Sequence, residues 1–196
     1  MKGLFIAVSG PSGVGKGTVL NLVKKAFPKA VYLVSETTRK MRPHEKPGQV
    51  YDFVSREHFE KGIAEDKYLE YAIVHEQEYY GTLKQPVLDA LKDGKLMIRE
   101  IDRQGMHQIK KLLPSENFLS IFIYPPSLEI LLDRISHRGT LPDEEMKRRM
   151  ESARVEIADE DSYDYRVINE QGKLQECFEK IVEIIKKECE KRGIEV

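Results

Sequence analysis

A glycine-rich segment directly after a short apolar run constrains the fold of this chain more than any other feature. The run covers residues 4–8, and the segment that follows, residues 10–18, has the sequence GPSGVGKGT. Its glycines allow the backbone to wrap closely around an anion with several N–H groups pointing inward. Residues 18–27 carry apolar side chains at helical spacing, and the start of a helix favours anions. The pattern predicts a phosphate-binding loop between a buried strand and a helix.

The spacing of Gly10, Gly15 and Lys16 is that of a P-loop, in which the lysine approaches the outer phosphates of a nucleotide. The strict pattern has Ser or Thr directly after the lysine, whereas here Gly17 comes before Thr18. This departure and the absence of an N-K-x-D motif disfavour a switch GTPase. A glycine-rich turn without a ligand is the alternative hypothesis, but the flanking strand and helix patterns favour a P-loop.

Length and composition favour one soluble domain with inserted lobes. The chain has 196 residues, of which 40% are hydrophobic, so it can bury a substantial core. With 32 Lys and Arg against 33 Asp and Glu, the net charge of −1 attracts neither nucleic acid nor membranes, and any anion site must be local. Because no apolar run is long enough for a signal-peptide core or a membrane span, we expect a cytoplasmic protein.

The cysteines and histidines predict neither a disulfide nor a structural metal. Cys177 and Cys189 lie on one predicted helix at a separation of roughly 18 Å, which is too far for a disulfide. Cys177 continues an apolar stripe, which favours a packing role. The histidines show no metal-ligand spacing.

Short apolar runs alternate with helical patterns along most of the chain. This alternation predicts an α/β, three-layer P-loop fold with a five-stranded parallel sheet. The predicted strands are residues 4–8, 30–34, 96–101, 119–123 and 165–168, and the predicted helices are residues 18–27, 85–92, 105–113, 127–136, 143–159 and 173–191.

Two segments interrupt this alternation. Residues 35–84 are polar and tyrosine-rich, with strand patterns at 52–54 and 69–74, and predict an inserted lobe. Residues 137–155 contain a glycine hinge and are basic, which suits a lid that closes over phosphates. The predicted P-loop core then comprises residues 1–34, 85–136 and 156–196.

A series of motifs, covering nearly the whole chain, resembles the guanylate kinases. In chain order they are SETTRKMRPHE, YDFVS, LEYA, YYGT, EIDRQG, IFIYPPS, RISHRGT and YDYRVIN. The resemblance implies transfer of the γ-phosphoryl group of MgATP to GMP or dGMP, with ATP as co-substrate, Mg²⁺ as cofactor and residues 35–84 as the GMP-binding lobe. Adenylate kinases also have a GKGT ending, so Gly17 is compatible with a kinase of this kind.

The resemblance implies that Arg39 and Arg42 bind the phosphate of GMP, because planar guanidinium groups suit a phosphate dianion. Tyr51 and Tyr80 would add hydroxyl donors. Taken singly, such arginines are more often solvated and such tyrosines half-buried in strands. Their placement in matching motifs is what favours the binding role.

The resemblance also implies that Glu70 accepts hydrogen bonds from N1–H and the 2-amino group of guanine, while Ser35 and Thr82 match the hydroxyls that contact O6. Adenine has a lone pair at N1 and lacks the 2-amino group, so a buried carboxylate would lose its partners. Sites of this type discriminate by about 10⁴-fold. Taken alone, Glu70 would be an exposed charge on a strand edge.

Glu100 and Asp102 stand two residues apart at the end of the predicted strand 96–101, which places both at the carboxyl edge of the sheet, where ligands bind. By resemblance they lie near magnesium and the acceptor nucleotide. The predicted metal set is Thr18, Glu100 and Asp102, mostly through water. An N-cap for the next helix is the alternative role of Asp102.

A phosphate monoester with a second pKa of about 6 needs no general base, so catalysis here would consist of alignment and charge neutralisation. The resemblance implies that Lys16 and basic residues of the lid surround the transferred group. The predicted catalytic residues are Lys16, Arg42, Asp102, Arg134, Arg138 and Arg149. The predicted ATP-binding residues are Gly10, Pro11, Ser12, Gly13, Val14, Gly15, Lys16, Gly17, Thr18 and, near the adenine, Asn169. The predicted GMP-binding residues are Ser35, Arg39, Arg42, Tyr51, Glu70, Tyr80, Thr82, Glu100 and Asp102.

Three positions depart from the usual family pattern. Arg99 stands in a central strand position that is usually apolar, Val50 replaces an acidic residue, and residues 75–78 are one residue longer than usual before Tyr79. A kinase of another small phosphorylated acceptor remains an alternative. Guanylate-kinase-like domains of scaffold proteins, which bind peptides, are a second one. Those domains typically have degraded nucleotide sites and accompany other interaction domains, whereas Lys16 is intact and no such domain is expected here.

Overall fold

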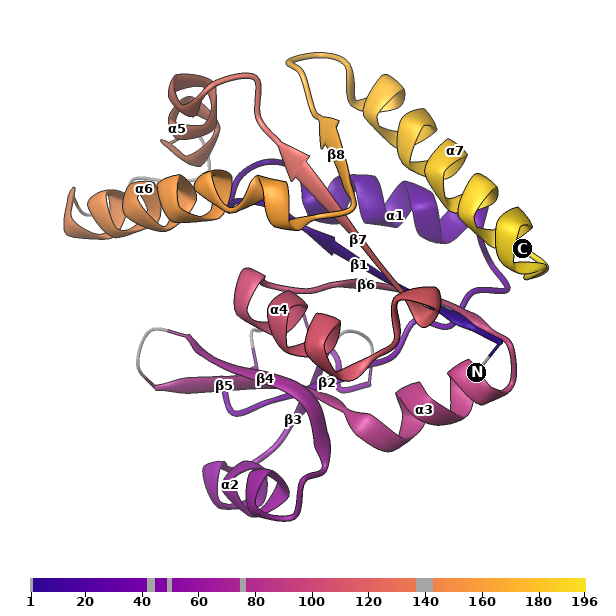
Figure 1. The fold of residues 1–196 in the computed structure, drawn as a ribbon. Coiled ribbons are helices and arrows are strands. Elements are labelled where there is room, and N and C mark those ends of the chain that lie inside the picture. The colour runs from indigo at the N-terminus through magenta and orange to yellow at the C-terminus, as the bar shows by residue number, and fades with distance from the viewer. Residues whose placement is uncertain (1, 42–44, 49–50, 75–76, 137–142) are drawn as a thin grey trace.

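The computed structural model describes residues 2–41, 45–48, 51–74, 77–136 and 143–196, which form two sheets with helices packed around them (Figure 1). The first sheet is parallel and has the strand order β6-β1-β7-β8. Since these strands all run the same way, their carboxyl ends meet at one edge. The strands are β1 (Leu4–Ser9), β6 (Leu96–Glu100), β7 (Phe118–Tyr124) and β8 (Tyr165–Ile168).

Helices cover both faces of the parallel sheet because its strands are apolar on both sides. In β1, Leu4 and Ile6 pack in a core with residues of α1 (Lys16–Ala26) and α7 (Leu174–Arg192). Phe5 and Ala7 point to the other face, where the core includes residues of α3 (Lys84–Lys92) and α4 (Arg103–Leu112).

The prediction of a fifth parallel strand at residues 30–34 is wrong. Only Val31 forms a bridge, with Met97, so the parallel sheet has four strands. Two residues further on, the carbonyl of Leu33 accepts a hydrogen bond from the Arg99 side chain at 2.7 Å. The segment therefore leaves the sheet after one bridge and leads directly into the second sheet.

The second sheet is mixed and has the strand order β3-β2-β5-β4. Its strands are β2 (Ser35–Thr37), β3 (Tyr51–Phe53), β4 (Tyr68–Val74) and β5 (Glu78–Leu83), and α2 (Arg56–Ala64) packs beside it. The strands predicted at 52–54 and 69–74 correspond to β3 and β4, whereas β2, β5 and α2 were not predicted. Phe59, Tyr68 and Tyr79 form a small aromatic core between α2 and this sheet.

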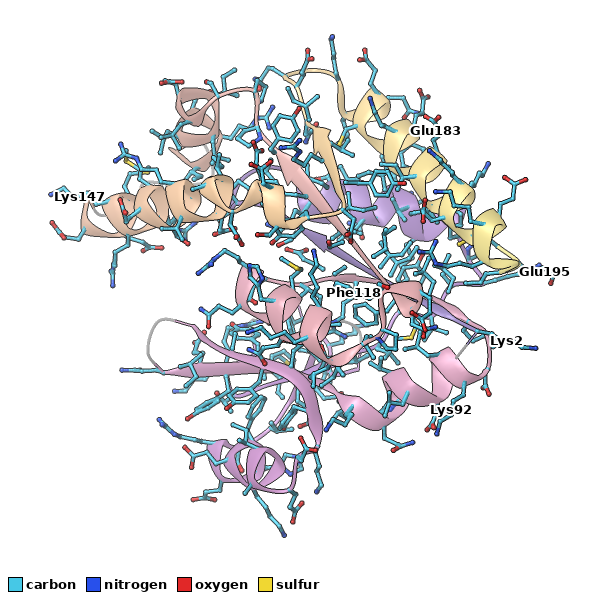
Figure 2. All side chains as sticks on the ribbon, viewed as in Figure 1. Lys2, Lys92, Phe118, Lys147, Glu183 and Glu195 are labelled. Atoms are coloured by element: carbon cyan, nitrogen blue, oxygen red, sulfur yellow. The ribbon has the colours of Figure 1, made fainter. Side chains whose placement is uncertain are left out.

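The helices α5 (Leu128–Ser136) and α6 (Asp143–Ala158) lie together at the end of the molecule where β7 terminates (Figure 1). Short 3₁₀ helices span Ser115–Asn117 and Glu160–Ser162. Figure 2 shows the charged side chains of Lys147 and Glu183 pointing away from the body of the molecule, as expected for the polar faces of covering helices. In the described part of the chain, no helix combines the length and apolar character that crossing a membrane requires.

Candidate active site

The loop after β1 has the backbone that the sequence predicts for an anion cradle. Gly10, Gly13 and Gly15 have φ angles of 144°, 89° and 99°, a region that side chains with a Cβ rarely adopt. At Gly10, a Cβ atom would also lie 2.1 Å from the carbonyl oxygen of Ile123 at the end of β7. The loop leads into α1, whose N-terminus faces it.

Lys16 connects the loop to the neighbouring strand. It is the first residue of α1, and its Nζ atom donates hydrogen bonds to the carbonyl oxygens of Gly10 at 2.5 Å and Pro11 at 3.2 Å. The same atom lies 3.7 Å from Oε1 of Glu100, the last residue of β6. The lysine and the carboxylate thus meet at the carboxyl edge of the parallel sheet.

Asn169 lies against this loop from the end of β8. Its Nδ2 atom donates a hydrogen bond to the carbonyl oxygen of Val14 at 2.7 Å, and its side chain is buried. Arg134 of α5 donates in turn to the carbonyl oxygen of Asn169 at 3.0 Å. The amide of Asn169, predicted to lie near adenine, therefore fixes the backbone of the loop.

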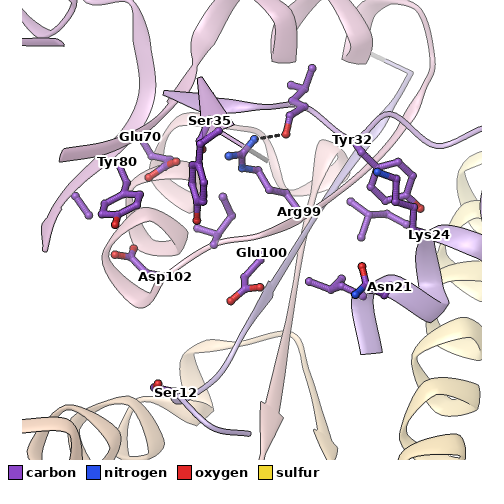
Figure 3. Close-up of a pocket in the computed structure, with 16 residues that line it drawn as sticks. Ser12, Asn21, Lys24, Tyr32, Ser35, Glu70, Tyr80, Arg99, Glu100 and Asp102 are labelled. Carbon is purple, nitrogen blue, oxygen red and sulfur yellow. Dashed lines mark hydrogen bonds between the residues drawn. The ribbon is translucent and has the colours of Figure 1, made fainter. Parts of the chain in front are cut away.

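A cavity of about 600 Å³ lies between the loop, α1 and the second sheet (Figure 3). Most residues of the predicted acceptor site line it, together with one residue of the loop. These residues are Ser12, Ser35, Tyr51, Glu70, Tyr80, Glu100 and Asp102. The cavity thus joins the P-loop to the second sheet.

Glu70 and Thr82 are brought together by strand register. They are direct partners in the antiparallel pair of β4 and β5, and the Thr82 hydroxyl donates a hydrogen bond to Oε1 of Glu70. Both side chains are buried, and burial raises the pKa of Glu70 while the Thr82 hydrogen bond lowers it. The pairing continues to Val74 opposite Glu78, and Glu70 stays in register with Thr82 although the sequence predicts an additional residue in the connection between the two strands.

Arg39 is held beside the cavity by an acidic residue that the sequence analysis missed. Its guanidinium donates to both carboxylate oxygens of Glu45 at 2.8 and 2.9 Å, and these bonds raise its pKa further. The rings of Tyr51 and Phe53 lie 5.5 Å from the Arg39 guanidinium carbon. The position of Glu45 a few residues after Arg39 was a signal, but only the fold shows that the two side chains meet.

Asp102 has the capping role considered as its alternative. It is the N-cap of α4, and its Oδ1 atom accepts a hydrogen bond from the Gly105 N–H at 2.6 Å. Glu100, two residues earlier, is exposed and lies between Asp102 and Asn21 in the view of Figure 3. Glu156 of α6 was also missed. Burial raises the pKa of Glu156, and the charge of Lys16 lowers it.

The two predicted lid arginines that the structure describes have different partners. Arg134 contacts the end of β8 through Asn169, whereas Arg149 pairs with Glu145 within α6 at 2.6 Å. Thr18 is exposed in the first turn of α1. Arg42, Arg138 and Val50 lie outside the described residues.

The chain is similar to guanylate kinases in sequence and in structure. The family model described as guanylate kinase matches residues 2–188. A guanylate kinase of Carboxydothermus hydrogenoformans is 46% identical over 169 residues, which cover 86% of this chain and 81% of that protein. A guanylate kinase of Helicobacter pylori is 43% identical over 182 residues, covering 93% of this chain and 86% of the relative. The crystal structure of guanylate kinase from Anaplasma phagocytophilum superposes with a TM-score of 0.76 at 32% identity, covering 95% of this chain and 86% of that one.

Proposed function

The chain belongs to the guanylate kinase family, and on that premise we propose how its residues transfer the γ-phosphoryl group of ATP to GMP. The reaction of the family gives ADP and GDP. One observation carries the proposal: a single cavity reaches from the P-loop to the buried pair of Glu70 and Thr82. ATP then binds at the loop and GMP, or dGMP, at the second sheet. Residues 1–34, 85–136 and 156–196 form the core, and residues 35–84 form the acceptor lobe.

The donor half consists of residues 10–18, whose backbone N–H groups surround the phosphates of ATP. Lys16 moves from the loop carbonyls to the β- and γ-phosphates when ATP binds, because phosphate is the stronger acceptor for an ammonium group. Asn169 supports the loop from behind through Val14.

The residues around Lys16 fit a magnesium ion. Mg²⁺ prefers oxygen ligands and keeps several waters, and the Thr18 hydroxyl and the Glu100 carboxylate are both exposed here. Asp102 has one carboxylate oxygen on the Gly105 N–H, which leaves the other for a water of the ion. When bound, the ion neutralises charge on the transferred phosphoryl group. The space beside Gly17 is open, because a Cβ atom there would meet no other atom within 4 Å. The ion and its waters therefore have room next to Lys16.

In the acceptor half, Arg39 and Arg42 bind the phosphate of GMP, with hydroxyl donors from Tyr51 and Tyr80. The ion pair with Glu45 and a hydrogen bond from Nη1 to the carbonyl oxygen of Lys40 at 2.7 Å hold the Arg39 guanidinium in place. Its other N–H groups then bind the phosphate beside Tyr80. The Tyr80 hydroxyl donates to Glu78 at 3.1 Å and is reoriented toward the phosphate on binding.

The base of GMP is recognised by the Glu70 carboxylate, which accepts from guanine N1–H and the 2-amino group. The hydroxyl of Ser35 donates to O6, and that of Thr82 does so by turning from Glu70 toward the base on binding. Glu100 and Asp102 lie toward the sugar and the transferred phosphoryl group. AMP offers an acceptor where GMP offers a donor, so the buried carboxylate would lose its partners.

The phosphoryl acceptor needs no general base, because the phosphate of GMP is largely ionised at neutral pH. Catalysis comes from alignment and from positive charge around the transferred group. Residues 137–155 act as a lid that brings Arg138 and Arg149 to the phosphates, beside Arg134. Closure requires Arg149 to exchange its carboxylate partner Glu145 for a phosphate.

A coupled assay of ADP release tests the function with GMP, dGMP, AMP, CMP and UMP as acceptors. We expect turnover with GMP and dGMP, and a rate with AMP lower by about 10⁴-fold in kcat/KM. Equal turnover with GMP and AMP would favour a kinase of another acceptor. Absence of GMP turnover together with calorimetric absence of GMP and ATP binding would favour a peptide-binding domain.

A further inference from the structure

Arg99 places a positive charge inside an otherwise apolar strand. The preceding residues of β6, Leu96, Met97 and Ile98, are buried in the two cores. The Arg99 side chain instead lines the cavity, with Glu70 and Ser35 on one side of it and Tyr32 on the other (Figure 3). A guanidinium stays protonated even where burial lowers its pKa, as it does here. The strand thus delivers a permanent cation to the acceptor side of the cavity.

One hydrogen bond of Arg99 holds the chain segment that enters the second sheet. Its Nη1 atom donates to the carbonyl oxygen of Leu33 at 2.7 Å, two residues before Ser35 begins β2. Before Leu33, this segment pairs with β6 through the single bridge between Val31 and Met97. The hydrogen bond from Arg99 therefore holds this segment where its pairing with β6 has ended. It thereby fixes the position at which Ser35 reaches the cavity.

Among the described residues, the other side chains that act on Glu70 do not carry a positive charge. From β5, Thr82 donates a neutral hydrogen bond, and from the N-terminus of α4, Asp102 adds a negative charge that raises the pKa of Glu70. The backbone of α4 approaches so closely that a Cβ atom on Gly105 would lie 2.5 Å from Oε2 of Glu70. Arg99 on β6 is the cation whose charge opposes the effect of burial on this carboxyl group.

Part of the Arg99 guanidinium is buried without a hydrogen bond. The Nε atom of Arg99 is buried and lacks a hydrogen-bond partner among the described residues. Burying this N–H group without a partner costs free energy. An apolar residue at position 99 would avoid that cost, so the contact with Leu33 alone does not explain the arginine. The arrangement is therefore explained better by what the charge does in the cavity than by stability.

Resting on the proposed role of Glu70 in guanine recognition, we propose that Arg99 is a positioning residue of the acceptor site. It fixes the segment from Leu33 to Ser35 through its hydrogen bond, and its charge keeps the Glu70 carboxylate available as an acceptor for the guanine donors. An apolar residue at position 99 would leave Glu70 facing Asp102 without a compensating cation.

The test measures kcat/KM for GMP against pH in Arg99→Gln, Arg99→Met and Arg99→Lys. Gln retains a donor for the Leu33 carbonyl but has no charge, Met has neither and suits the apolar neighbours, and Lys keeps the charge. In both neutral variants we expect the acid limb of the profile to move upward by about one pH unit, which lowers kcat/KM about tenfold on the steep part of the limb and leaves it nearly unchanged on the plateau at higher pH. The Lys variant should keep the limb of the unchanged chain. The titration of the GMP phosphate is common to all variants and cancels in their ratios.

Arg166→Gln is the matched control, because Arg166 lies on β8 of the same sheet, is exposed and pairs with Asp161. It should leave the profile unchanged. The proposal is overturned if the neutral variants lose the same factor at every pH, or if Lys and Gln behave alike. Failure of the proposed guanine recognition looks different: Glu70→Gln would then use GMP as well as the unchanged chain does, whatever the Arg99 variants show.

Discussion

At the residue scale, the carboxyl group of Glu70 has opposite effects on folding and on substrate binding. Burial raises its pKa, so between the pKa of the unfolded chain, about 4.3, and the higher folded value the native state binds more protons. The stability that Glu70 contributes is therefore lost as pH rises through this window. At neutral pH the ionised group destabilises the fold, whereas in the proposed function the same charge provides the acceptor for guanine.

Glu70→Gln should raise the melting temperature at about pH 7.5 by a few degrees, since the amide removes a buried charge and still accepts from Thr82. The same change should lower kcat/KM for GMP on the order of 10²- to 10³-fold through loss of charged hydrogen bonds. Thermal unfolding and the coupled assay measure the two effects, with Glu179→Gln on the exposed face of α7 as control. A variant that is less stable at neutral pH would contradict the assigned destabilisation.

The role of a single residue was predictable where it depends on neighbours close in the sequence, as in a motif or a helix cap. The Asp102 cap depends on residues three apart, and the P-loop glycines lie within one short segment of the chain. By contrast, Asn169 and Val14 are 155 positions apart, and only the parallel pairing of β7 with β8 brings them together. The partnership of Arg39 with Glu45 likewise depends on how the chain turns between β2 and β3.

At the element scale, the P-loop depends on β8 for its shape. We expect Asn169→Ala to raise the KM for ATP about tenfold and to leave the KM for GMP unchanged, because the Val14 carbonyl loses its donor while the acceptor lobe is untouched. Asn169→Asp should be worse, since a carboxylate would face that carbonyl. Initial rates at varied ATP and varied GMP separate the two constants. Equal increases in both would refute a role confined to the loop.

The end of α7 is secured by the buried carboxylate of Glu188. Burial alone would raise its pKa, but hydrogen bonds from Lys191, Arg192 and Tyr165 lower it to about 2. A depressed pKa contributes stability that is present above the unfolded value and lost as pH falls from about 4.5 through about 2.

Glu188→Gln should therefore reduce the free energy of unfolding by about 2 kcal/mol near neutral pH, and the deficit should shrink at about pH 3. Urea unfolding at the two pH values measures this difference. The neighbouring Glu190→Gln, which is exposed, serves as the control. A deficit of the same size at both pH values would show that packing, and not the charge, is responsible.

Elements with strong apolar patterns were predictable, and those set by tertiary pairing were not. The apolar runs of β1, β6 and β7, the shorter strand β8 and the amphipathic helices were found within a few residues of their bounds. Residues 30–34 have a strand-like composition, but the Leu33 carbonyl oxygen accepts a hydrogen bond from the Arg99 side chain instead of pairing with a strand of the parallel sheet. The strands β2 and β5 alternate polar and apolar residues only briefly, so their pairing depends on the sheet that they complete.

At the scale of the whole molecule, the proposed function places ATP at the P-loop of the parallel sheet and GMP at the second sheet. Each ligand should then stabilise the chain independently, and a ligand at 100 times its Kd stabilises by about 2.7 kcal/mol. We expect Glu70→Gln to lose most of the shift in melting temperature with GMP and to keep the shift with ATP, whereas Lys16→Met should do the reverse. Thermal shift at graded nucleotide concentrations checks this without any turnover. Loss of both shifts in either variant would contradict the division.

The most direct test is a crystal structure of this chain with GMP and a non-hydrolysable ATP analogue with Mg²⁺. The account predicts the guanine N1 and 2-amino group within hydrogen-bond distance of the Glu70 carboxylate, and the γ-phosphate on the loop of residues 10–18 beside Lys16. GMP bound with its phosphate on that loop, or with its base away from Glu70, would contradict it.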